Sequence, residues 1–192
     1  MNGHRFGILA CMALLAAAVA VKAADAIGQV GKEYFTKVNI WFEKKDNIPT
    51  TNYHRGLMMP LGTKVRIASM GKGKIQFTDM AANVTYTLVH NTKHNPGDLA
   101  MIFAQYFSDV NVVDSRGLFE KFSRSEKENI KAGKVETGMC KDAVLAAYGN
   151  PPGHVTPALT YDTWVYWNSR AERLQVKFEN DKVKETVIIR GP

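Results

Sequence analysis

Three strand-like segments close the sequence, and their alternation constrains the fold more than any other feature. Leu174-Gln175-Val176-Lys177-Phe178 alternates apolar with polar side chains, the pattern of a strand with one buried face. Aromatic and β-branched residues, which favour strands, fill residues 163–167 and 183–189. Asn180-Asp181-Lys182 predicts a tight hairpin between the last two segments. Together they predict a three-stranded antiparallel meander.

Helical patterns precede this meander. Gly149 and the two prolines after Asn150 end a predicted helix that spans residues 141–148. Asn95 and Pro96 predict the start of another helix, whose apolar face follows at helical spacing. Helices before an antiparallel meander predict an α+β fold in which the helices pack on one face of a three-stranded sheet.

Residues 27–91 show a different pattern. Short strands are predicted over residues 38–42, 63–67, 74–78 and 84–88, with turn residues between them. Short strands at this spacing favour a small barrel or a curled sheet. The run MPLGTKVRI, residues 59–67, resembles a hairpin of bacterial SH3-like modules. A small, mostly β, SH3-like module is therefore expected in this part of the chain.

The N-terminus has the features of a secretory signal peptide. An apolar run extends from Phe6 to Val21 and small residues follow it. A spanning helix needs about 20 apolar residues, so cleavage is preferred to a membrane anchor. A lipoprotein with its lipid on Cys11 is the other alternative, although the apolar run continues beyond that cysteine.

The predicted organisation has four parts. A signal peptide covers 1–26, a β-rich module 27–95, connecting helices 96–132, and an α+β domain 133–192. The signal peptide implies a periplasmic or outer-membrane-associated location.

The C-terminal part also resembles a known family. The residues that carry the likeness are, in order, Gly138-Met139, Val144, Tyr148-Gly149-Asn150-Pro151, Trp164-Val165-Tyr166, Val176-Lys177-Phe178 and Lys182-Val183. Their order is similar to that of the SmpA/OmlA family, also called BamE-like, over about residues 130–190. The resemblance implies helices on a three-stranded sheet, and a non-enzymatic role in the cell envelope that involves protein partners and anionic lipid. Outer-membrane protein assembly and envelope integrity are the processes that it suggests.

Cys140 raises the question of thiol chemistry. It stands where the helix over 141–148 begins, and both the helix N-terminus and Lys141 favour a thiolate. A nucleophile also needs a base, and His154 lies beyond the far end of that helix, about 12 Å away along its axis. Cys140 is therefore interpreted as a helix cap. A reactive or redox thiol, in an envelope enzyme, is the alternative function.

Aromatic residues provide the candidate binding surfaces. Trp164 and Tyr166 point to one face of the predicted strand and Trp167 to the other, so one set is core and the other a contact surface. Trp and Tyr are common at interface hot spots. The segment Tyr53-His54-Arg55, in a loop, is a second candidate surface.

The charge distribution and the predicted loop around His90 and His94 argue against nucleic-acid and metal binding. The net charge is +7, but the cations are scattered, which argues against nucleic acid as a partner. His90 and His94 have the spacing of zinc ligands on a helix, yet they lie in a predicted loop, so no metal and no cofactor is expected. The sequence predicts a non-catalytic binding or scaffold protein with an envelope protein partner. A peripheral module for anionic lipid or peptidoglycan is a further alternative.

Overall fold

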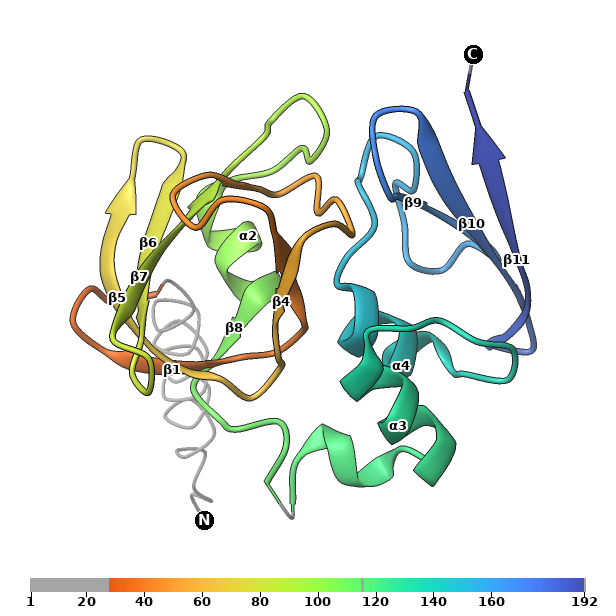
Figure 1. The fold of residues 1–192 in the computed structure, drawn as a ribbon, viewed down its shortest axis with the longest axis horizontal. Helices are drawn as coiled ribbons and strands as arrows, with labels where there is room; N and C mark the ends of the chain where they lie inside the picture. Colours follow the sequence, from red (N-terminus) through yellow and green to blue (C-terminus); the bar gives the residue numbers. More distant parts are fainter. Residues whose placement is uncertain (1–27, 115, 192) are drawn as a thin grey trace, which may run out of the picture.

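The predicted α+β class is wrong. The computed structural model describes residues 28–114 and 116–191, and strands account for 35% of the chain against 18% for helices. The fold is mostly β, with a curled six-stranded sheet as its largest element, and is not built as helices packed on a three-stranded sheet (Figure 1). The difference arises because many short strands in the first half pair with one another, whereas the helices span no more than nine residues.

The curled sheet lies in the first half of the chain. Its strands have the order β3-β7-β6-β5-β1-β8. Their bounds are Glu33–Thr36 (β1), Ile48–Pro49 (β3), Lys64–Gly71 (β5), Lys74–Asp79 (β6), Val84–Val89 (β7) and Phe107–Ser108 (β8). A separate two-stranded sheet pairs β2 (Ile40–Phe42) with β4 (Leu57–Met59).

One helix fills the concave side of this sheet (Figure 1). Helix α2 (Leu99–Tyr106) buries Ile102, Phe103 and Tyr106, and these side chains share a hydrophobic cluster with buried residues of β5 and β6. The helix begins later than predicted because Asp98, not Asn95, caps it. Asp98 accepts a hydrogen bond from the backbone N–H of Met101 at 2.8 Å. We call residues 28–108 the N-terminal lobe.

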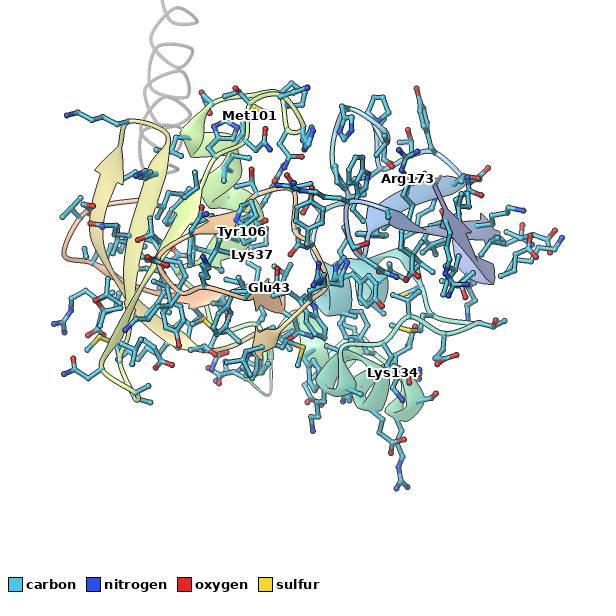
Figure 2. All side chains as sticks on the ribbon, turned by 45° about the horizontal axis from the view of Figure 1, so that its top comes forward. Lys37, Glu43, Met101, Tyr106, Lys134 and Arg173 are labelled. Atoms are coloured by element: carbon cyan, nitrogen blue, oxygen red, sulfur yellow. The ribbon has the colours of Figure 1, made fainter. Side chains whose placement is uncertain are left out.

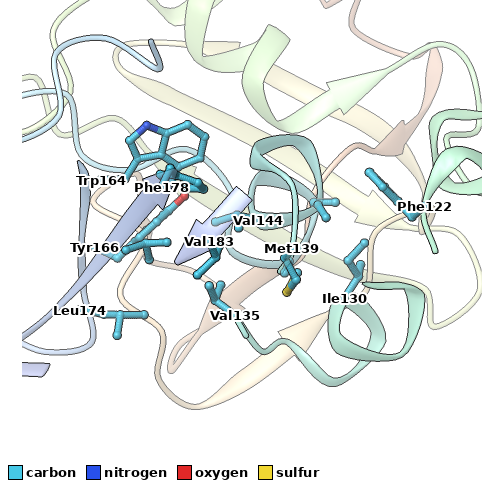
Figure 3. Close-up of a cluster of buried hydrophobic side chains, with 14 of the residues drawn as sticks. Phe122, Ile130, Val135, Met139, Val144, Trp164, Tyr166, Leu174, Phe178 and Val183 are labelled. Carbon is cyan, nitrogen blue, oxygen red and sulfur yellow. The ribbon is translucent and has the colours of Figure 1, made fainter. Parts of the chain in front are cut away.

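The second half of the chain has its own core, and we call residues 116–191 the C-terminal lobe. It contains a 3-10 turn (Leu118–Lys121), α3 (Arg124–Ala132), α4 (Lys141–Tyr148), β9 (Thr163–Trp167), β10 (Glu172–Glu179) and β11 (Lys182–Arg190). The strands form an antiparallel sheet in the order β11-β10-β9. Figure 3 shows their buried side chains, with Trp164 and Phe178 meeting those of α3 and α4 around Val144.

The helix termini of this lobe follow local sequence signals. Ser123 caps α3 and forms a capping box with Glu126. Gly133 ends α3 in the left-handed conformation, at φ +61°. The predicted helix from Lys141 to Tyr148 is confirmed as α4, with Gly149 after its last turn.

The helices of the predicted connecting segment 96–132 belong to two different cores. Helix α2 packs in the N-terminal lobe, whereas α3 packs against α4 in the C-terminal lobe. Buried polar bonds join the lobes. The Asn39 side chain donates to the carbonyls of Ile130 at 2.7 Å and Ala147 at 3.2 Å, and it accepts from the N–H of Leu61 at 2.9 Å.

Candidate functional site

A groove of about 700 Å³ opens where the lobes meet. The N-terminal lobe contributes Trp41, Phe42, Glu43, Lys44, Asn47, Pro49, Tyr53 and Arg55, and the turn between β9 and β10 contributes Ser169, Arg170 and Ala171. Figure 2 labels Glu43 and Arg173 on opposite sides of the boundary between the lobes. The groove therefore depends on how the lobes are held together.

Strand β2 supplies two of the aromatic side chains in the groove. Ile40 is fully buried, whereas Trp41 and Phe42 are only partly covered. Pairing with β4 fixes the strand, since Trp41 lies opposite Met58. Gly133 allows α3 to approach Trp41, because a Cβ atom at that position would lie 2.5 Å from the indole ring. The indole thus lies against both lobes.

Positive charge exceeds negative charge around the groove. Arg55 pairs with Glu43 at 3.2 Å, and both side chains are more than half exposed. Among the described residues, Lys44 and Arg170 form no ion pair. These two cations are available to an occupant that carries carboxylates or other anionic groups.

A smaller cavity of about 370 Å³ shares Trp41, Arg55 and Ser169 with the groove and reaches His54. The His54 ring stacks on Tyr148, with centroids 3.9 Å apart, and Nε2 donates to the Tyr148 carbonyl at 2.9 Å. Burial lowers the pKa of His54 to about 4, against the opposing effect of backbone hydrogen bonds. His54 is therefore neutral near pH 7, and its ring helps to join the lobes.

The structure brings some of the sequence-derived candidates together and separates others. Tyr53 lies beside Trp167, with ring centroids 6.1 Å apart, so the two proposed surfaces meet. Arg55 is exposed at the groove. Trp164 and Tyr166 are fully buried, and the Tyr166 hydroxyl donates to the Gly149 carbonyl at 3.0 Å. These two side chains lie on the same face of β9, and that face belongs to the core.

Several groove residues were not singled out from the sequence. Trp41 and Phe42 were assigned only to a strand, and Lys44, Ser169 and Arg170 to no site. The available signal was the adjacent aromatic pair at positions 41 and 42, since two consecutive bulky side chains cannot both face one core. The contribution of the β9–β10 turn could not be found from the sequence, because it depends on contact between the lobes.

The histidines do not converge on a metal-ligand arrangement. His90 Nε2 donates to the Asn95 carbonyl at 2.9 Å, whereas the His94 ring stacks on His154 with centroids 4.5 Å apart. Burial lowers the pKa of His94, and the nearby His154 and Lys93 add to this effect. Residues 28–114 and 116–191 contain no group of three or more His, Cys, Asp or Glu that could hold a metal ion.

Cys140 and His154 lie toward opposite ends of α4. Cys140 is the N-cap residue and its side chain makes no capping hydrogen bond, while His154 contacts His94 and Trp167 beyond the C-terminus of the helix. Burial raises the pKa of Cys140 against the opposing effect of the Ala143 backbone N–H, and the carboxylates of Glu126 and Asp142 add to the rise. Lys141 pairs with Asp162 and Asp181. The thiol form is therefore favoured, contrary to the expected activation.

Replacing Cys140 with serine is expected to leave the fold intact and to stabilise it by about 0.5–1 kcal/mol, because a hydroxyl oxygen caps a helix better than sulfur does. Urea unfolding of both proteins measures the change in the free energy of unfolding. Cys140→Ala, which has no capping group, is the control and should not be stabilised. Loss of binding by a well-folded Cys140→Ser variant would instead assign a chemical role to the thiol.

Comparison with known proteins identifies no relative. No protein-family model, no curated protein and no solved structure matches this chain. None of the helices in the described part of the chain has the length and apolar character needed to cross a membrane.

Proposed function

We propose that the protein is a non-catalytic binding protein of the bacterial cell envelope, and that the groove between its lobes holds an extended segment of a protein partner. The observation that carries the proposal is the combination of aromatic side chains with free cations in one opening of about 700 Å³. Trp, Tyr and Arg are the residues that most often dominate binding energy at protein interfaces. The envelope location rests on the predicted signal peptide and on the resemblance of residues 130–190 to SmpA/OmlA proteins.

The arrangement of the groove favours binding over catalysis. Burial shifts the pKa of two titratable groups in the adjoining cavity, His54 and Tyr148, toward their neutral forms. The His54 Nε2 is also bound to a backbone carbonyl. A general base must reach the proton that it removes, whereas this ring is occupied by contacts between the lobes. Lys44 and Arg170 instead offer exposed charges suited to recognition.

Site-directed photocrosslinking tests the proposed groove. A photoreactive amino acid at Asn47 or Ser169, one on each side of the groove, is expected to give a protein adduct in an envelope extract. The same label at exposed Glu128 on α3 is the control and should give no such adduct. Arg170→Glu should reduce the adduct at Asn47, since it reverses one of the free charges.

The crosslinking result also distinguishes a protein partner from lipid or peptidoglycan. Equal labelling from Glu128 would refute the groove as the binding site. Labelled lipid or glycan in place of protein, accompanied by co-sedimentation with anionic vesicles or cell-wall sacculi, would replace the protein partner with a peripheral envelope-binding role.

A further inference from the structure

Strand β11 is an open edge of the C-terminal sheet. It pairs with β10 on one side, and in the described structure only its first residues have backbone partners on the other side. There Val183 exchanges hydrogen bonds with Gly138 and Met139, at 2.8 Å each. From Lys184 to Arg190 the outer side makes no backbone hydrogen bond to a described residue. Figure 1 shows the strand at the outer margin of the molecule.

The hydrogen-bond pattern decides which backbone groups face outward. The N–H of Gly191 donates to the Ala171 carbonyl at 2.8 Å, and Arg190 lies opposite Glu172 in the register. Residues that bond to an antiparallel neighbour alternate along a strand. Beyond the bulge at Lys184, residues 185, 187 and 189 therefore bond to β10, whereas residues 186, 188 and 190 present their N–H and C=O groups to the open side.

The segment Thr186–Ile189 of this edge lacks the usual protection against pairing. Natural edge strands are short, or carry charges, proline or a β-bulge. Strand β11 has nine residues. Lys182, Lys184, Glu185 and a β-bulge protect its first half, whereas Thr186–Ile189 in its second half contains neither charge nor proline. Ile188 is 51% exposed and Ile189, on the opposite face, is 38% exposed. Apolar exposure on both faces is expected where a further strand extends the sheet, because that strand flanks both side chains.

We propose that two copies of this chain pair antiparallel through their β11 edges, about a twofold axis at Ile188. Ile188 then lies opposite its counterpart, Thr186 opposite Arg190, and Val187 opposite Ile189. The outward groups of Ile188 face each other and bond in both directions. The two three-stranded sheets become one continuous sheet, and the contact is isologous, as in most homodimers.

Charge disfavours two of the other symmetric registers. An axis at Val187 places Lys184 opposite Arg190, and an axis at Thr186 places Lys182 opposite Arg190. Like charges directly opposite each other destabilise a strand pair. An axis at Ile188 avoids both clashes and leaves Arg190 paired with Glu172 of its own chain at 3.1 Å. This self-complementarity is the reason to assign the edge to a second copy.

The test is the concentration dependence of molecular mass, measured by sedimentation velocity on the purified protein and its variants. The parent protein is expected to form dimers as its concentration rises through the micromolar range. Ile188→Pro removes an outward N–H without removing a bond to β10, and should raise the dimer dissociation constant about tenfold or more. Ile188→Lys places two cations on the axis and should do the same if the proline variant unfolds.

Ile188→Val is the matched control, since it retains the N–H and the apolar side chain and should dimerise like the parent. Circular dichroism of each variant establishes that the fold is retained. A parent protein that stays monomeric at all concentrations would overturn the proposal. Dimers that persist unchanged in folded Ile188→Pro and Ile188→Lys would overturn it equally. Neither outcome tests the groove, because none of its lining residues belongs to β11.

Discussion

Replacing Asn39 with alanine is expected to lower the free energy of unfolding by about 3–5 kcal/mol. The side chain is fully buried between the lobes. Its removal leaves the carbonyls of Ile130 and Ala147 and the N–H of Leu61 without their partner. Each unsatisfied buried group costs about 1–3 kcal/mol. Equilibrium urea unfolding, followed by tryptophan fluorescence, measures the difference.

Two further variants test whether the lost hydrogen bonds of Asn39 cause the loss of stability. Asn129→Ala makes the same change on α3, at a side chain that forms no hydrogen bond with a described residue, and should alter stability little. Asn39→Asp keeps the shape but directs an oxygen at the Ile130 and Ala147 carbonyls, so it should destabilise at least as strongly as alanine. A loss of less than 1 kcal/mol for Asn39→Ala, on the scale of an ordinary surface substitution of about ±0.5 kcal/mol, would show that the lobes do not depend on this residue.

Stability is expected to fall by up to about 3 kcal/mol between pH 6.5 and pH 4 through His54 alone. Its pKa drops from 6.5 in the unfolded chain to about 4 in the fold because of burial. Above pH 6.5 both states are neutral and the full stability is present. As the pH falls, the unfolded chain binds a proton that the folded protein does not, so stability is lost until the folded pKa is reached. His94, whose pKa is also lowered, adds a change of the same sign.

Thermal unfolding of the parent and of His54→Asn over this pH range measures the contribution. The variant should be less stable near pH 7, because it loses the stacking on Tyr148, but its stability should depend less on pH. His90→Asn, at a histidine that does not contact His54, is the control and should keep the pH dependence of the parent. Parallel pH profiles for the parent and His54→Asn would rule out His54 as the source.

Local sequence signals were sufficient for the individual elements of the C-terminal lobe. Helix α4 starts and stops at Cys140 and Gly149 as predicted, since caps and prolines act over a few residues. Strand β10 follows from alternation, and β9 and β11 follow from their aromatic and β-branched residues. The fold class was not predicted correctly, because the balance of strands and helices depends on pairing between distant short strands in the first half. Strand β3, for example, has two residues and exists only through pairing with β7.

The sequence by itself determined where helix α4 begins and ends, which residues of β10 alternate toward a core, and that Cys140 and His154 stand at opposite ends of that helix. Only the tertiary structure decided that Tyr53 and Trp167 face one another across the lobes, that Arg170 joins Trp41 in one groove, and that His54 stacks on Tyr148 and is neutral. The physical reason is the distance along the chain over which each interaction acts. Propensity, capping and alternation act between near neighbours, whereas a groove and a shifted pKa arise from desolvation and packing between segments that are far apart in the chain.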